Sequence, residues 1–321
     1  VGAGSFGTAL AVHVADLGNA VMLWTRSAEH ADAMRTSKAN ARYLPGRALP
    51  ENLVPTSFLE QALDGATLVI SALPAQTTRS VWTRARAHIP KGAPILCVSK
   101  GIETQTLALM SDVFESVVPA HPAGFVGGPS FAAEIAGHQP TAIVLASRDA
   151  EMASAAQRML SCDWLRTYVS ADVVGVELGG ALKNVIAIAS GCAEGLGLGL
   201  NARAALITRG LAEITRVAVG LGADPATLAG LAGLGDLVLT CTGDLSRNRR
   251  VGIELGKGRK IDEILRDMGH VAEGVDTARS AHDLATRNDI DMPIAREVYR
   301  ILFEGRSPKE AVRDLMRRAL K

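Results

Sequence analysis

The sequence of 321 residues is poor in cysteine, in aromatic side chains and in net charge. Its four cysteines, Cys97, Cys162, Cys192 and Cys241, lie far apart, with no CxxC pair and no histidine at ligand spacing. This spacing argues against a disulfide scaffold and against a metal site, so we expect reduced, mostly buried thiols in the cytoplasm. A formal net charge of +1 gives no argument for a nucleic-acid or membrane-surface partner. Any anion recognition must come from local clusters.

Uninterrupted apolar runs are also missing. The longest candidate, residues 173–200, is broken by Glu177, Lys183, Asn184 and Glu194, which favours a buried helix over a membrane span. The length exceeds one comfortable core, so two domains are expected. No signal peptide is visible; the chain opens inside what reads as a strand, and we therefore expect a few residues before Val1.

What the sequence does contain is a glycine-rich opening, VGAGSFGT. Gly2, Gly4 and Gly7 fit the GxGxxG pattern, a helical run follows at residues 8–17, and a second strand follows at residues 20–25. In a Rossmann unit these glycines make a tight turn, admit a pyrophosphate and allow close helix packing, with the phosphates at the helix N-terminus. The GxGxxG motif by itself is weak evidence for dinucleotide binding. The order of strand, loop, helix and strand around it strengthens that interpretation.

The second strand ends in Thr25, Arg26 and Ser27, where NAD-binding chains usually carry an acidic residue. An arginine suits a 2′-phosphate, so we expect NADPH to bind at least as well as NADH. A plain surface arginine is the alternative.

Further apolar strands alternate with helices such as residues 78–88, which predicts a mostly parallel, Rossmann-like sheet domain over residues 1–172. The expected strands are residues 67–73, 94–99, 124–126, 141–146 and 166–169. Loops at their carboxyl ends, at residues 73–76, 99–101 and 127–134, are candidates for ligand binding. The last offers the hydroxyl of Ser130 and a helix start, although ordinary turn glycines explain it equally well.

After Asp172 the alternation stops, and residues 173–321 read as an all-helical domain. Lys183 lies in the middle of an apolar helical stripe, and Gly179 and Gly180 remove side-chain bulk one turn before it, so something can approach closely there. The alternative is a lysine that snorkels to solvent. Asn201 is a candidate cap for the next helix.

Two segments of this half suggest chemistry. In GLGDLVLTCTG, Asp236 and Thr240 are four residues apart and would share one face of a helix. In SRNRR, residues 246–250, three arginines follow a serine that could cap a helix, and guanidinium groups with helix N-terminal amides make a phosphate site. A surface charge run is the alternative.

These motifs, taken in order, resemble the bacterial type of NAD(P)-dependent glycerol-3-phosphate dehydrogenase over essentially the whole chain. The blocks that carry the resemblance are GAGSFGTALA, SKGIE, GGPSFAAEI, ELGGALKNVIAIASG, GLGDLVLTCT, SRNRR and AEGVDT. The resemblance implies an N-terminal dinucleotide-binding domain followed by an all-helical domain.

Carried onto this sequence, the resemblance makes Lys183 the catalytic proton donor and acceptor. It implies substrate contacts from Lys100, Gly128, Ser130, Lys183, Asn184, Asp236, Thr240, Ser246, Arg247 and Asn248. With the glycine loop and Arg26 included, the expected cofactor contacts are Gly2, Gly4, Ser5, Phe6, Gly7, Arg26, Lys100, Ala132, Arg247, Val271 and Glu273.

The implied reaction is the reversible reduction of dihydroxyacetone phosphate by NADPH or NADH to sn-glycerol 3-phosphate, which would feed phospholipid synthesis in the cytoplasm. Burial and the like charge of Lys100 would both lower the pKa of Lys183 and make it an effective acid. A helical domain rich in alanine and leucine would suit a homodimer, although burial within one chain explains the same residues. Two alternatives stay open: another two-domain dehydrogenase for a different small phosphorylated substrate, and a non-catalytic NADPH-sensing protein.

Overall fold

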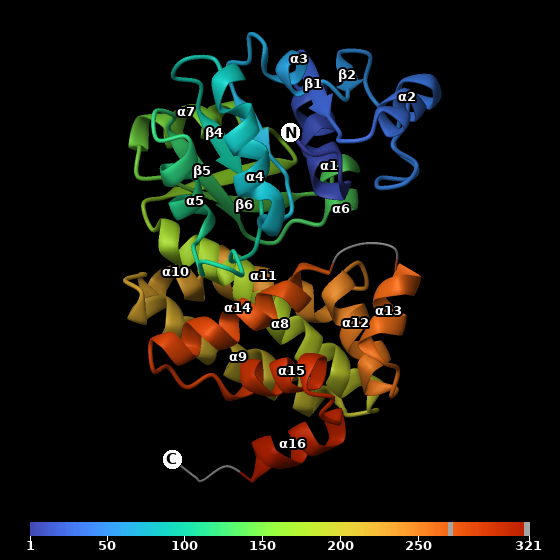
Figure 1. The fold of residues 1–321 in the computed structure, drawn as a ribbon, viewed down its shortest axis with the longest axis vertical. Coiled ribbons are helices and arrows are strands. Elements are labelled where there is room, and N and C mark those ends of the chain that lie inside the picture. The colour runs from blue at the N-terminus through green and yellow to red at the C-terminus, as the bar shows by residue number, and fades with distance from the viewer. Residues whose placement is uncertain (269–271, 318–321) are drawn as a thin grey trace. The chain divides into compact units, whose positions relative to one another are not determined.

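The computed structural model describes residues 1–268 and 272–317, which fall into two compact units (Figure 1). The first comprises Val1–Ser99 and Met110–Val173 and holds a sheet with helices. The second comprises Lys100–Leu109 and Val174–Lys321, and its described residues form helices and the loops between them. The predicted fold class, a Rossmann-like domain and an all-helical domain, is confirmed.

The sheet unit is mostly parallel. Its strands are β1 (Val21–Trp24), β2 (Leu53–Thr56), β3 (Val69–Ser71), β4 (Ile95–Cys97), β5 (Ala123–Gly127), β6 (Thr141–Ala146) and β7 (Leu165–Ser170). β1 pairs with β2, β3 to β5 run parallel in order, β6 is antiparallel to β5, and β7 is parallel to β6.

The first residues of the chain connect the β1–β2 pair with the other five strands. The amide of Gly2 donates to the carbonyl of Trp24 at 3.0 Å, and the amide of Ala72 donates to the carbonyl of Val1 at 2.8 Å. The opening of the chain therefore lies between β1 and β3, as a Rossmann unit requires.

The strands expected from residue 20 onwards are all present, but β2 was not predicted. The opening residues 1–3, which read as part of a strand, belong to no strand in the structure, although Val1 and Gly2 hydrogen-bond to Ala72 and Trp24. β2 contains Pro55, and proline lacks the amide that a central strand needs. β2 pairs only with β1, so it lies at the edge of the sheet, where that missing donor is tolerated.

Helices cover both faces of this sheet. Leu10 of α1 (Ser5–Asp16) and Leu160 of α7 (Ala150–Leu160) belong to one apolar cluster with strand residues. On the other face, Trp82 of α4 (Ala75–Ala85) contacts Phe114 of α5 (Met110–Val117), which contacts Phe125, with ring centroids 5.6 and 6.1 Å apart. The shorter elements are α2 (Ala28–Ser37), α3 (Leu59–Leu63), η1 (Arg86–His88) and α6 (Ala132–Ala136).

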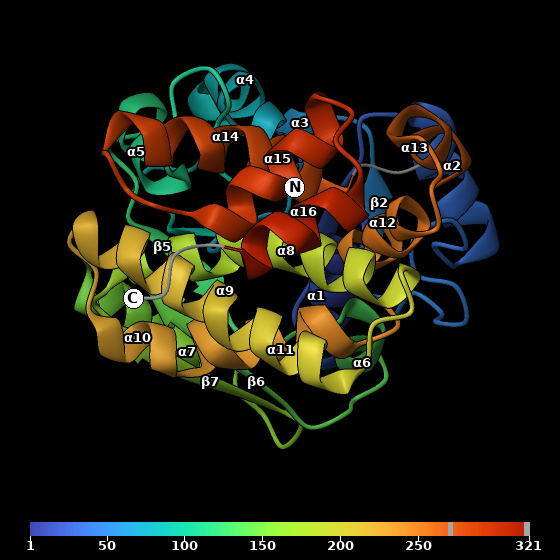
Figure 2. The same ribbon diagram turned by 90° about the horizontal axis from the view of Figure 1, so that it is seen from below.

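The helical unit is organised around α8 (Val173–Gly195), which other helices of the unit enclose (Figure 2). They are α9 (Leu200–Gly220), α10 (Pro225–Ala229), η2 (Leu231–Gly235), α11 (Asp236–Thr242), α12 (Arg247–Gly256), α13 (Ile261–Met268), α14 (Glu273–Arg287), α15 (Pro293–Phe303) and α16 (Pro308–Met316). By length and composition α8 could cross a membrane, but 89% of its most apolar window is buried inside the structure, as in the core helix of a soluble protein.

Two local features differ from the sequence predictions. α9 begins at Leu200 with Gly199 as its N-cap, so Asn201 lies inside the helix and does not cap it. The predicted division at residues 172 and 173 also left Lys100–Leu109 with the sheet domain, whereas this segment belongs to the helical unit. The reason is hydrophobic: Ile102, Leu107 and Leu109 are buried in the helical core.

Candidate active site

The glycine loop has the geometry of a dinucleotide-binding turn. Gly2 has a φ of +107°, and a Cβ added there would lie 2.8 Å from the carbonyl carbon of Ala72. A Cβ at Gly7 would lie 2.8 Å from the Cβ of Ala72, so this glycine permits close packing of α1. A Cβ at Gly4 would meet nothing within 4 Å, which leaves the backbone open to a ligand.

The start of α1 is available to an anion. Gly4 is the N-cap and supplies no side-chain hydrogen bond, so the first amides of the helix, at Ser5 and Phe6, are not capped by that residue. Such amides attract phosphate groups.

The end of β1 presents a cation and no carboxylate. Thr25 is buried, and its hydroxyl is hydrogen-bonded to Nδ1 of His30 at 3.1 Å. Ser27 caps α2 by accepting from the amide of His30. Between them Arg26 is exposed and has no hydrogen-bond or ion-pair partner among residues 1–268 and 272–317.

The predicted substrate loop follows β5 in the sheet unit. Gly128 has a φ of +95°, and the hydroxyl of Ser130 donates to its carbonyl at 2.9 Å. Ala132 is the first residue of α6. These three residues therefore lie at the carboxyl end of a central strand, where ligands of open α/β sheets bind.

In the helical unit, Asp236 holds two lysines. Its side chain is fully buried; one carboxylate oxygen accepts from Nζ of Lys183, and the other accepts from Nζ of Lys100 at 2.7 Å. Lys183 is only 6% exposed, so the alternative of a lysine that snorkels to solvent is wrong. The close approach predicted beside Gly179 and Gly180 is also present. A Cβ at Gly180 would lie 3.5 Å from Cγ of Lys100.

The pKa of Lys183 is lowered from 10.5 to about 8, mainly by burial and also by the charge of Lys100, while Asp236 acts in the opposite direction. The predicted direction and both of its predicted causes are confirmed. An ammonium with a pKa near 8 is mostly protonated at neutral pH yet releases its proton readily, which suits a general acid.

Side-chain amides surround this centre. Asn184 Nδ2 donates to the carbonyl of Lys100 at 3.3 Å, and Asn248 Nδ2 donates to Asn184 Oδ1 at 2.9 Å. The amide of Gly274 donates to Asn248 Oδ1 at 3.0 Å. On α11, the hydroxyl of Thr240 donates to the carbonyl of Asp236 at 2.6 Å, so both residues share one helix face as predicted.

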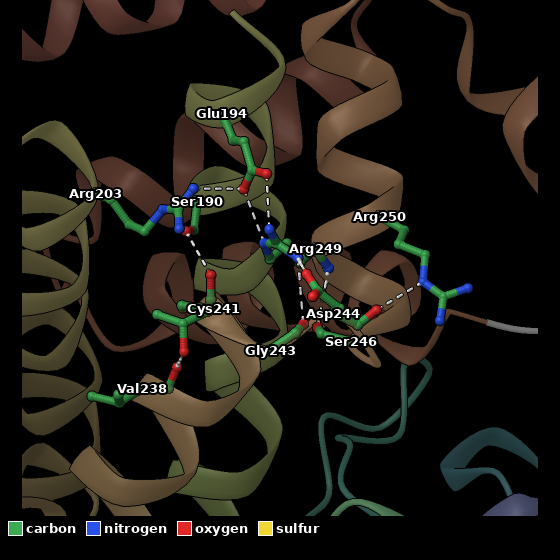
Figure 3. A network of polar contacts seen from close by, with 11 residues as sticks. Ser190, Glu194, Arg203, Val238, Cys241, Gly243, Asp244, Ser246, Arg249 and Arg250 are labelled. Atoms are coloured by element: carbon green, nitrogen blue, oxygen red, sulfur yellow. Dashed lines mark hydrogen bonds and ion pairs between the residues drawn. The ribbon is translucent and has the colours of Figure 1, made fainter. Parts of the chain in front are cut away.

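The three arginines of SRNRR have different surroundings, and Figure 3 shows two of them, Arg249 and Arg250. Ser246 caps α12 by accepting from the amide of Arg249, as predicted. Arg249 is buried and pairs with Glu194, and Arg250 donates to the carbonyl of Asp244. Arg247 is exposed, and no residue in the described ranges pairs with it. Of the three, it is the one whose guanidinium has no protein partner in those ranges, whereas Arg250 is exposed and engages only its Nε.

The structure thus brings Lys100, Lys183, Asn184, Asp236, Thr240 and Asn248 into one cluster, while the glycine loop, Arg26 and Gly128–Ala132 belong to the sheet unit. Glu273 is the first residue of α14, and Val271 lies outside the described residues. The ion pair between Glu194 and Arg249 was not predicted. The sequence feature that could have indicated it is an acidic residue in the last turn of an apolar helix, because such a residue needs a buried cation to compensate it.

No disulfide joins the four cysteines, and among the described residues no group of three or more His, Cys, Asp or Glu side chains could hold a metal ion.

Comparison with known proteins gives one consistent answer. The family profiles described as NAD-dependent glycerol-3-phosphate dehydrogenase N-terminus and C-terminus match residues 1–153 and 172–313. The chain belongs to this family. It is 52% identical to glycerol-3-phosphate dehydrogenase [NAD(P)+] of Myxococcus xanthus, over 99% of this chain and 96% of that protein.

Other members of the glycerol-3-phosphate dehydrogenase family agree. The Anaeromyxobacter enzyme of the same description is 51% identical, over 100% of this chain and 98% of that protein. The crystal structure of glycerol-3-phosphate dehydrogenase from Coxiella burnetii, 41% identical, superposes with a TM-score of 0.96 and covers 99% of this chain and 97% of that chain. The resemblance seen in the sequence is therefore confirmed over the whole chain.

Proposed function

We propose that this protein catalyses the reversible reduction of dihydroxyacetone phosphate to sn-glycerol 3-phosphate with NADPH or NADH. The observation that carries the proposal is the buried cluster of Lys183, Asp236 and Lys100, in a chain that belongs to the glycerol-3-phosphate dehydrogenase family. A lysine ammonium whose pKa burial lowers to about 8 is a proton donor suited to neutral pH.

The residues of the sheet unit fit a dinucleotide. Gly4 leaves open space beside the N-terminus of α1, and the amides of Ser5 and Phe6 begin that helix, which suits a pyrophosphate. Arg26 would hold a 2′-phosphate, and Ala132, Glu273 and Lys100 would complete the contacts. When bound, the nicotinamide supplies the hydride that reaches the carbonyl carbon of the substrate.

Lys183 handles the proton. As negative charge develops on the carbonyl oxygen of dihydroxyacetone phosphate, the ammonium stabilises that charge by a hydrogen bond and then transfers its proton. In the reverse direction the neutral amine accepts the proton of the hydroxyl group. Asp236 holds Nζ in place, and Lys100 shares the carboxylate and contacts the substrate.

The phosphate would be bound by the start of α12. Arg247 supplies a guanidinium there, and Ser246 and Asn248 flank it, with Asn248 fixed by Asn184. Gly128 and Ser130 would contact the substrate from the loop after β5, and Thr240 supports Asp236 from one turn away.

A different small phosphorylated substrate is a second candidate function, favoured by an exposed arginine at a helix N-terminus, which recognises phosphate whatever carries it. A non-catalytic NADPH sensor is a third, and the buried lysine pair counts against it, because a sensor has no need of a buried acid.

Three finer proposals accompany the reaction. The product would supply glycerol phosphate for phospholipid synthesis, and the protein would act in the cytoplasm. It would also form a homodimer through the helical unit, where Leu200 is 76% exposed and Val219 and Val238 are also exposed. Sedimentation of the purified protein as a monomer would refute the dimer.

One spectrophotometric assay tests the function. Oxidation of NADPH, and then of NADH, is followed at 340 nm with dihydroxyacetone phosphate and with unphosphorylated dihydroxyacetone. We expect rapid turnover with the phosphate ester and little with the free triose. Equal rates would refute the role of the phosphate site, and cofactor binding without turnover would favour the sensor.

A further inference from the structure

The carboxyl-terminal end of α8 and α12 approach each other closely along α12 from Arg249 to its last residue, Gly256. A Cβ added at Gly191 would lie 2.9 Å from Cα of Gly252, and one added at Gly195 would lie 3.0 Å from Cα of Gly256. Each helix therefore presents glycines four residues apart to the other. Backbones in such contact have a fixed axial register, because no side chain separates them.

A partly buried ion pair joins the two helices at the same interface (Figure 3). Nε and Nη2 of Arg249 donate to the two carboxylate oxygens of Glu194, at 2.9 and 2.8 Å, in a bidentate arrangement. Arg249 is 7% exposed. Glu194 lies in the last turn of α8, where a carboxylate opposes the helix dipole, so the compensating cation is needed there.

The same guanidinium also fixes the loop that leads into α12. Nη1 of Arg249 donates to Oδ1 of Asp244 at 2.9 Å. The backbone amide of Arg249 donates to the hydroxyl of Ser246, the N-cap of α12, at 3.2 Å. Arg249 thus contacts both the loop before α12 and the N-cap residue of that helix. Arg247 and Asn248 are the next residues after that cap.

We propose that Glu194 and Arg249 form a positioning pair, which sets the start of α12, and with it Arg247 and Asn248, in register with Lys183 on α8. Neither residue of the pair touches the reacting atoms. This inference rests on the proposed function, because it assigns the pair to the substrate's phosphate site. Loss of the ion pair lets the start of α12 shift by a fraction of an ångström. This shift weakens binding of the phosphate and leaves Lys183, the proton donor, in place.

The chain provides a matched control. Nη2 of Arg203, on α9, donates at 2.8 Å to the Glu194 oxygen that also accepts from Nε of Arg249. Within residues 1–268 and 272–317, Arg203 has no hydrogen bond or ion pair with α12. Arg203→Gln therefore removes a comparable ion pair from the same carboxylate without releasing the start of α12.

The experiment compares the wild type with Glu194→Gln, Arg249→Lys and Arg203→Gln. Thermal unfolding first establishes that each is folded at the assay temperature, and Arg249→Lys keeps the charge while it removes the bidentate fork. We expect the first two to raise KM for dihydroxyacetone phosphate about tenfold or more. Their kcat and their KM for NADPH should stay within about threefold of wild type, and Arg203→Gln within about twofold in all three constants.

Equal losses in kcat and in both KM values, or a KM for dihydroxyacetone phosphate unchanged in folded Glu194→Gln and Arg249→Lys, would overturn the positioning role. Calorimetric titration with sn-glycerol 3-phosphate, without cofactor, repeats the comparison without turnover and should show the same ranking of affinities. An active wild type with unaltered variants overturns this inference alone. A wild type that neither binds nor turns over the phosphate ester overturns the proposed function as well.

Discussion

Replacing Asp236 by Asn is the most informative single change, because it alters the charge beside Lys183 and nearly preserves shape. Asp236 is the carboxylate that raises the pKa of Lys183 against the effect of burial, and Lys100 lowers it. Without the negative charge, burial and the charge of Lys100 act unopposed. The pKa of Lys183 must then fall below about 8.

The magnitude follows from elementary electrostatics. Two unit charges about 4 Å apart interact by about 4 kcal/mol at an effective dielectric constant of about 20, which would lower a pKa by about 3. Because the carboxylate is shared with Lys100, we take about 2, which brings Lys183 to about 6, within the range known for buried lysines. At pH 7 its protonated fraction then falls from about nine-tenths to about one-tenth.

The assay is the pH dependence of kcat in both directions. In the wild type, reduction should decline as pH rises through about 8, and oxidation of glycerol 3-phosphate should increase there, since it requires the neutral amine. In Asp236→Asn both limbs should move down by about 2 pH units, with reduction at pH 7 about tenfold lower and recovering towards pH 5.5. A loss by the same factor at every pH and in both directions would refute the reasoning.

Three further predictions concern other parts of the chain. Arg26→Ala should weaken NADPH binding about tenfold or more and NADH binding little, by fluorescence titration, since a charged contact to the 2′-phosphate is lost; equal losses would contradict it. Gly191→Ala should lower the free energy of unfolding, measured in urea, by about 1–3 kcal/mol, because the added Cβ overlaps the backbone of α12 at Arg249. In the control Gly199→Ala the added Cβ meets nothing within 4 Å, so the free energy of unfolding should change by less than about 1 kcal/mol. Burial raises the pKa of Glu213 to about 7 against hydrogen bonds from two amides of α15, so its contribution to stability is present at low pH and is lost as pH rises through about 7. Relative to Glu213→Gln, the wild type should lose up to about 3 kcal/mol between pH 5 and 8, and parallel stability curves would count against this.

Much of the fold was predictable because its signals are local. The glycine loop, the apolar strands from residue 20 onwards and the Ser246 cap of α12 each depend on a few neighbouring residues, and the structure has them as predicted. β2 was missed because its short sequence includes Pro55, and only its place at the sheet edge makes that residue acceptable.

The site was predictable residue by residue but not as an arrangement. Sequence alone marked Lys183 as unusual and put Asp236 on a helix. The carboxylate of Asp236, however, binds two lysines that are distant in the chain: Lys100, which is 136 positions away, and Lys183, which is 53 positions away. The arginines of SRNRR read as one basic cluster, and which of them turns inward depends on Glu194, which lies on another helix. Such long-range pairings are decided by packing, which no local pattern records.

The most direct measurement is single-turnover reduction of dihydroxyacetone phosphate by Lys183→Ala, together with NADPH titration of the same variant. Removal of a general acid typically costs a hundredfold to ten-thousandfold, so we expect the chemical step to slow by about that factor while the dissociation constant for NADPH stays within about twofold of wild type. A variant that binds NADPH normally and reduces the substrate at the wild-type rate would show that Lys183 does not donate the proton.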